Sequence, residues 1–174
     1  YYPESNSNSS LGGSVIDSDS ASKDATGTGS KTDGEKVSDS TANGGSAIAV
    51  TSNSTRQILF SGYFSNVPFG RVSISARMKS SIGSGTMNLI EINTYFVDTS
   101  GEEFVETLLD SVNINGNMFG IANEYVGIGM ITDYKGVATG SIFLKVEIIV
   151  LPDTGATIYF DQLAIAMDLR TSGG

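Results

Sequence analysis

The stretch MNLIEINTYFV, residues 87–97, decides the fold class of this chain. Alternate residues of this stretch fall on opposite sides of an extended backbone: Ile90, Ile92, Thr94 and Phe96 on one side, and Leu89, Glu91, Asn93 and Tyr95 on the other. A period of two is typical of a β-strand, whereas a helix repeats its apolar residues at every third or fourth position. We therefore predict a strand over residues 87–97.

The same pattern continues on both sides of this stretch. Residues 71–79 (RVSISARMK) alternate polar with apolar side chains, and residues 141–151 (SIFLKVEIIVL) are the strongest strand candidate. Further strands are expected over residues 47–51, 56–64, 102–114, 124–132 and 156–169. No segment has convincing helical periodicity. About eight strands separated by turn-forming residues predict an all-β protein, an antiparallel β-sandwich.

The composition excludes several classes of function. The 174 residues include no Cys, His or Trp, which excludes ordinary zinc sites, disulfides, thiol nucleophiles and Ser-His-Asp triads. The formal net charge of −9 supplies no basic face for nucleic acid. No run of about 18 apolar residues occurs, which argues against insertion into a membrane. Any metal site would have to use oxygen ligands, as calcium and magnesium sites do.

Residues 1–46 differ in composition from the rest of the chain. They are mostly Ser, Asp, Gly, Thr, Asn and Lys, and alone they would bury too little apolar area to offset their backbone entropy. Two interpretations stay open: a flexible tail, or long surface loops joined by short strands at residues 14–17 and 36–39. The predicted organisation is a polar segment over residues 1–46, a β-sandwich over residues 47–170 and a tail over residues 171–174.

Four short motifs follow one another along the chain. They are DSTANGGSA at residues 39–47, VPFGRVSISARMK at residues 67–79, YFVDTSG at residues 95–101 and TIYFDQL at residues 157–163. In this order they resemble motifs of the galactose-binding-like jelly rolls, which include carbohydrate-binding modules and domains of secreted enzymes and phage structural proteins. The resemblance implies a jelly-roll domain that works outside a cell or on a virion surface.

The resemblance also implies a structural calcium ion. Related jelly rolls often hold such an ion between an N-terminal loop and the last strand, which maps the site onto Glu4 and Asp161, with residues 39–46 as neighbours. Carboxylates and the backbone carbonyls of a glycine-rich loop are typical calcium ligands. The alternative is that Asp161 caps a turn or faces water.

Aromatic residues at strand ends and in glycine-rich segments are the candidates for binding sugar rings. They are Tyr63, Phe69, Phe119, Tyr125 and Tyr134. For each of them the alternative is packing in the core or along a strand edge.

Catalysis is not expected. Paired carboxylates can hydrolyse a glycosidic bond, but the candidate glutamates lie in no recognisable motif: Glu91, Glu102, Glu103, Glu106, Glu124 and Glu147.

Two non-catalytic functions stay open. The first is a structural or adhesive subunit of an extracellular or virion assembly that recognises surface carbohydrate. Such a subunit would contact copies of itself, as a homo-oligomer or filament, or other assembly proteins. Few charged residues protect its strand edges, and residues 1–46 could add a strand to a neighbour's sheet. The alternative is a carbohydrate-binding module of a larger secreted enzyme.

Overall fold

Every strand predicted between residues 47 and 169 is present in the computed structural model, which describes residues 30–64, 70–98, 105–134 and 142–168. The elements in chain order are β1 (Ser30–Lys31), β2 (Glu35–Ser38), the 3-10 turn η1 (Asn43–Gly45), β3 (Ser46–Thr51), β4 (Gln57–Phe64), β5 (Gly70–Ser80), β6 (Asn88–Asp98), β7 (Val105–Asn115), α1 (Gly116–Phe119), β8 (Val126–Tyr134), β9 (Ile142–Val150) and β10 (Thr157–Asp168).

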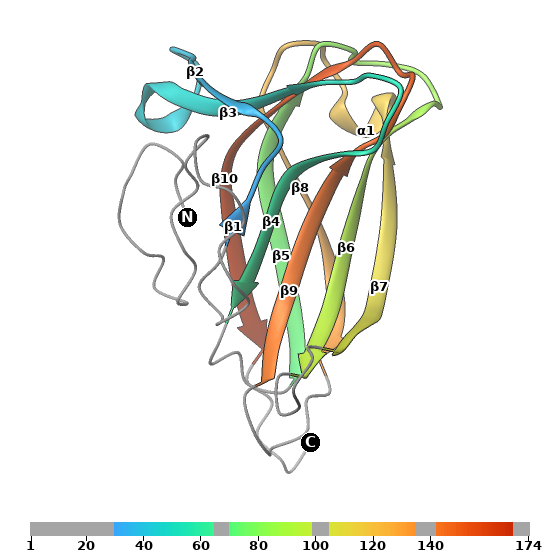
Figure 1. Cartoon of the computed structure of the whole chain (residues 1–174). Helices are drawn as coiled ribbons and strands as arrows, with labels where there is room; N and C mark the ends of the chain where they lie inside the picture. Colours follow the sequence, from blue (N-terminus) through green and yellow to red (C-terminus); the bar gives the residue numbers. More distant parts are fainter. Residues whose placement is uncertain (1–29, 65–69, 99–104, 135–141, 169–174) are drawn as a thin grey trace.

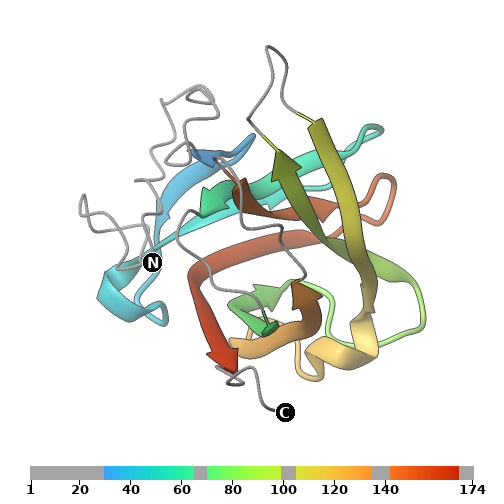
Figure 2. The ribbon, with the colours of Figure 1, turned by 90° about the horizontal axis from the view of Figure 1, so that it is seen from below.

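Two five-stranded antiparallel sheets face each other, as Figure 1 and Figure 2 show. Sheet A has the strand order β1-β4-β9-β6-β7, and sheet B has the order β2-β3-β10-β5-β8. From β3 to β10 the chain crosses to the other sheet at every step except that from β6 to β7. This path is a jelly roll. The predicted fold class is therefore confirmed, and the short strands β1 and β2 are added at its edge.

The core lies between the two sheets and follows from the alternation along each strand. In β9, every second residue from Leu144 to Val150 is fully buried. Phe60 of sheet A stacks on Phe160 of sheet B with ring centroids 5.1 Å apart, so an aromatic contact joins the sheets. Because the apolar faces meet inside, the polar side chains of the strands lie on the two outer faces.

Residues 30–38 close one edge of the sandwich. β1 pairs with β4 of sheet A and β2 pairs with β3 of sheet B, so this segment passes from one sheet to the other. Gly34 is required at the crossing, because a Cβ there would lie 2.6 Å from the carbonyl oxygen of Ala49. The short strand predicted at residues 36–39 is thus present as β2. The strand predicted at residues 14–17 lies outside the described residues.

The single helical turn α1, between β7 and β8, is not predicted by the sequence. Asn115 caps it by accepting a hydrogen bond from the backbone N–H of Met118 at 3.1 Å. The turn places Phe119 in the core, where its side chain is 0% exposed. The prediction that Phe119 offers a sugar platform is therefore wrong, because neither face of its ring is accessible. No helix in the described part of the chain is long and apolar enough to cross a membrane.

Candidate functional site

The outer face of sheet A carries a row of side chains from three neighbouring strands. Tyr63 of β4 lies opposite Lys145 of β9, and Lys145 lies opposite Tyr95 of β6. Since paired strands are about 5 Å apart, the backbones of the two tyrosines are roughly 10 Å apart with Lys145 between them. We call this row and the polar residues around it the tyrosine face, which comprises Arg56, Ser61, Tyr63, Glu91, Asn93, Tyr95, Glu106, Lys145 and Glu147.

Lys145 is at the centre of the tyrosine face. Its Nζ lies 5.4 Å from the centroid of the Tyr63 ring and 5.2 Å from that of the Tyr95 ring, within the range of cation–π attraction. The same Nζ donates a hydrogen bond to Oε2 of Glu106 at 3.0 Å. Only 13% of the Lys145 side chain is exposed. One largely buried cation therefore holds two rings and a carboxylate together.

Glu106 reaches this row from β7, the edge strand of sheet A. Its Oε1 accepts a hydrogen bond of 2.7 Å from the hydroxyl of Tyr63. Burial raises the pKa of Tyr63 above its usual value, and the hydrogen bond to Glu106 raises it further. Because β9 and β6 lie between β4 and β7, this hydrogen bond joins β4 to β7 across the outer face and passes over the two strands between them.

A second polar row runs beside the first. Asn93 donates through Nδ2 to Oε1 of Glu91 at 2.8 Å and to Oε1 of Glu147 at 3.3 Å. The Tyr95 hydroxyl donates to the same oxygen of Glu147 at 3.2 Å. Burial and the charge of Glu147 raise the pKa of Tyr95 to about 12. Arg56 pairs with Glu91 at 2.7 Å, and this hydrogen bond lowers the pKa of Glu91.

The tyrosine face thus combines aromatic rings with carboxylate, amide and cationic groups at short range. Binding sites for small molecules have this make-up, with apolar surfaces that supply contact area and a few fixed polar groups that orient the ligand. The face is suited to a ligand with flat apolar surfaces and several hydroxyl groups, because hydroxyls both donate to carboxylates and accept from N–H groups.

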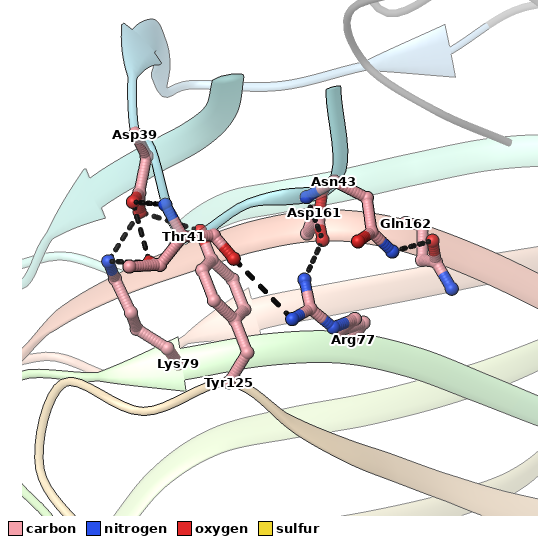
Figure 3. Close-up of polar contacts among 8 residues, drawn as sticks. All are labelled: Asp39, Thr41, Asn43, Arg77, Lys79, Tyr125, Asp161 and Gln162. Carbon is pink, nitrogen blue, oxygen red and sulfur yellow. Dashed lines mark hydrogen bonds and ion pairs between the residues drawn. The ribbon is translucent and has the colours of Figure 1, made fainter. Parts of the chain in front are cut away.

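The outer face of sheet B holds a second polar cluster, where the loop of residues 39–45 lies against β5 and β10 (Figure 3). We call this cluster the loop clamp, and it comprises Asp39, Thr41, Asn43, Arg77, Lys79, Tyr125, Asp161 and Gln162. Its contacts divide into two halves, one around Asp161 and one around Asp39.

The first half of the loop clamp is built on Asp161. Its Oδ2 forms an ion pair with Nη1 of Arg77 and accepts a hydrogen bond from the backbone N–H of Asn43 at 3.1 Å. Nη2 of Arg77 lies 3.5 Å from the backbone carbonyl oxygen of Thr41. The Asn43 side chain donates to Oε1 of Gln162 at 3.1 Å. These contacts fasten the loop to the last strand.

The second half is built on Asp39, which forms an ion pair with Lys79. Asp39 also accepts hydrogen bonds from the backbone N–H and hydroxyl of Thr41 at 2.9 and 2.7 Å, and from the Tyr125 hydroxyl at 2.9 Å. Burial opposes ionisation of Asp39, but these bonds outweigh it and hold the pKa of Asp39 well below its usual value. The Tyr125 ring also contacts Arg77, whose Cζ lies 4.5 Å from its centroid.

Asp161, predicted as a calcium ligand, is completely buried. Its Oδ1 has no hydrogen-bond partner, but Arg77 and Asn43 occupy its Oδ2. Nowhere in the described ranges do three acidic side chains gather as metal ligands. Calcium takes about six to eight oxygen ligands, so the described residues around Asp161 do not fit this ion. Glu4 lies outside the described residues, and its pairing with Asp161 stays a prediction.

The structure separates the aromatic residues predicted to bind sugar. Tyr63 lies on the tyrosine face, whereas Tyr125 lies in the loop clamp on the other sheet. Tyr134 is the last residue of β8 and pairs with Gly70, and Phe69 lies outside the described residues. The ligand-binding roles of these four residues stay predictions, and the two with described side chains do not form one platform.

Sequence reasoning missed Tyr95 and Lys145 as site residues. A partial signal exists for Tyr95, because it shares one predicted face of residues 87–97 with Glu91 and Asn93. No local pattern places Lys145 between two tyrosines. That placement arises because β9 pairs with β4 on one side and with β6 on the other.

A scan against protein-family models found no match, and a search of curated proteins also found none. Among solved structures, the enzymatically active domain of tailspike protein 4 of bacteriophage CBA120 has a TM-score of 0.54 at 10% identity, covering 80% of this chain and 19% of that chain. A family 16 carbohydrate-binding module has a TM-score of 0.49 at 9% identity, covering 78% of this chain and 86% of that chain. The module TmCBM61, in complex with β-1,4-galactotriose, has a TM-score of 0.44 at 15% identity, covering 80% of this chain and 87% of that chain.

At these identities the likeness concerns the fold alone. The strand path from β3 to β10 and the tailspike domain point to the same architecture. The chain therefore has the fold of a two-sheet antiparallel jelly-roll β-sandwich.

Proposed function

We propose that the chain is a non-catalytic carbohydrate-binding module that binds its glycan on the tyrosine face. The observation that carries this proposal is the row of Tyr63, Lys145 and Tyr95 across three adjacent strands. The proposal corresponds to a module of a larger secreted enzyme, the second of the two functions predicted from the sequence.

The two tyrosines supply the apolar part of the proposed site. A sugar ring has a face of C–H groups that packs on an aromatic ring, and Tyr63 and Tyr95 are both half-buried on an otherwise polar face. Lys145 contacts both rings and limits their movement. Because the rings are already held in place, binding costs less side-chain entropy.

The polar groups beside the rings supply hydrogen bonds to sugar hydroxyls. Glu147 and Asn93 lie beside Tyr95, and Glu106 lies beside Tyr63. Charged acceptors make hydrogen bonds roughly twice as strong as neutral ones. These groups already bond to one another, so a bound sugar would exchange one set of hydrogen bonds for another on a face whose side chains are in position.

The same contacts favour binding over hydrolysis. Glycoside hydrolysis needs one carboxyl group whose pKa is raised, so that it can act as a general acid. The pKa of Glu91 is instead lowered by its hydrogen bond from Arg56. The carboxylates of Glu106 and Glu147 lie 3.0 and 3.9 Å from Nζ of Lys145, so the two acids share one cation.

The substitution Tyr95→Ala tests the proposal. Its matched control is Tyr159→Ala, which removes a half-buried tyrosine from the outer face of sheet B. Binding to soluble xylan, mixed-linkage glucan, galactan and mannan is measured by affinity electrophoresis and calorimetry. We expect the unmodified chain to bind at least one of them. Tyr95→Ala should weaken that binding by about tenfold or more, or about 1.4 kcal/mol, while Tyr159→Ala leaves it within about twofold.

Far-UV circular dichroism of each variant checks that its fold is retained. Absence of binding to all four polysaccharides would contradict the proposal, and so would equal affinities of Tyr95→Ala and the unmodified chain. A loss seen with Tyr125→Ala but not with Tyr95→Ala would move the site to the loop clamp, which contains Tyr125.

A further inference from the structure

We propose that Arg77 takes the place of a metal ion in this jelly roll. In this interpretation its guanidinium is the cation that fastens the loop of residues 39–45 to the last strand, and the chain needs no calcium at Asp161. The inference rests on the loop clamp and is independent of glycan binding on the tyrosine face.

A β-bulge creates the need for a cation. The register between β10 and β5 shifts between Phe160 and Gln162, so Asp161 is the extra residue of the bulge. Bulges redirect a side chain. Here the Asp161 carboxylate accepts a hydrogen bond from the backbone N–H of Asn43, and Asp161 is 0% exposed. A buried carboxylate is destabilising unless a cation and hydrogen bonds compensate its charge.

Arg77 supplies that cation from the neighbouring strand, where it pairs with Gln162 in register. Figure 3 shows the guanidinium directed at both Asp161 and the loop, with Nη1 at Oδ2 of Asp161 and Nη2 at the backbone oxygen of Thr41. A calcium ion would collect the same two kinds of oxygen, carboxylate and main-chain carbonyl. Arg77 contacts both through its forked N–H groups.

The charges of the loop clamp already balance. Arg77 lies against Asp161, and Lys79 lies against Asp39, so each cation has one carboxylate. A divalent ion approaching Asp161 would also approach the guanidinium, which repels it. Among the described atoms of the clamp, Oδ1 of Asp161 is the one buried side-chain oxygen without a hydrogen-bond partner, and a single oxygen is far from a calcium coordination shell.

Thermal unfolding of the full chain tests the proposal. We expect EDTA and added calcium chloride each to leave the Tm of the unmodified chain unchanged within about 1 °C, because ligand-linked stabilisation requires binding. Arg77→Ala should lower the Tm by on the order of 10 °C, because Asp161 loses its cation. The matched control is Arg71→Ala on the same strand. Its ion pair with Asp133 is exposed, with 47% and 62% of the side chains accessible, so the Tm should change little.

A Tm of the unmodified chain that falls with EDTA and returns with calcium would overturn the proposal. Equal Tm values for Arg77→Ala and Arg71→Ala would also overturn it. If Arg77→Ala does not fold, Arg77→Lys keeps the charge but loses the fork. Hydrogen exchange of the Asn43 amide should then be faster in Arg77→Lys than in Arg71→Lys, and equal exchange in the two variants would contradict the role of Arg77.

Discussion

At the scale of single residues, both outer faces depend on cations held against tyrosine rings. Lys145 lies over Tyr63 and Tyr95, and Lys79 lies over Tyr125. In both places the ammonium group also contacts a carboxylate, so a ring and an acid share one cation. Lysine has a long flexible side chain whose ordering costs entropy, and several simultaneous contacts are needed to offset that cost.

Asp39 should make the stability of the protein depend on pH. Its pKa in the folded chain lies below the ordinary value of 3.8, since hydrogen bonds from Lys79, Thr41 and Tyr125 outweigh burial. A carboxyl group with a depressed folded-state pKa stabilises the fold above its unfolded pKa, and this contribution is lost as the pH falls through the folded pKa. We expect the Tm to fall as the pH is lowered from about 5 to about 2, and to fall by less in Asp39→Asn.

The Tm is followed by circular dichroism at each pH for both chains. Asp110→Asn, at an exposed position of β7, is the control and should keep the steeper fall of the unmodified chain. The fall should not vanish in Asp39→Asn, because the lowered pKa of Glu91 acts in the same direction. Parallel curves for the unmodified chain and Asp39→Asn would show that Asp39 does not contribute in this way.

At the scale of elements, β8 depends on close approach to β5. Gly127 and Gly129 both lie on the exposed side of β8. A Cβ at Gly129 would lie 2.1 Å from the carbonyl oxygen of Ile74, whereas a Cβ at Gly127 would find its nearest neighbour, Oγ of Ser75, at 3.7 Å. The backbone can therefore accept a side chain at Gly127 but not at Gly129.

Two alanine substitutions on β8 should consequently differ. Gly129→Ala should destabilise the fold by about 2 kcal/mol or more, because the β5–β8 pairing must open to admit the methyl group. Gly127→Ala should change the free energy of unfolding by less than about 1 kcal/mol, since it restricts the unfolded chain without a clash. Urea unfolding measures both. Similar losses in the two variants would contradict this account of the strand pairing.

The two sides of the sandwich differ in how their strand edges are covered. On one side, residues 30–38 add β1 to sheet A and β2 to sheet B. On the other side, β7 and β8 end the two sheets. Leu108 on β7 and Ile131 on β8 are 53% and 61% exposed there. These residues are the first place to look for contact with another protein.

At the scale of the whole molecule, oligomeric state separates the two functions predicted from the sequence. A binding module is expected to be a monomer of 18.2 kDa by light scattering. A closed ring, trimer or filament in light scattering and negative-stain microscopy would contradict the module and favour a structural subunit of an extracellular or virion assembly. Leu108→Lys and Ile131→Lys would then test whether the exposed edges form the joint.

The sequence by itself determined the fold class and the chemistry that the protein lacks. Alternation with a period of two, as in residues 71–79 and 87–97, is a local property and needs no knowledge of which strands become neighbours. The absence of Cys and His is likewise independent of conformation. For the same reason, the alternation alone places Tyr95 on one face with Glu91 and Asn93.

Only the tertiary structure decided which side chains meet. Strand order places Lys145 between Tyr63 and Tyr95, and it brings Glu106 to Tyr63 across two intervening strands. The β10 bulge and the pairing with β5 set Asp161 against an arginine rather than beside further acids. Register and bulges are set by the packing of strands far apart in the sequence, and a one-residue shift moves every side chain to the other face.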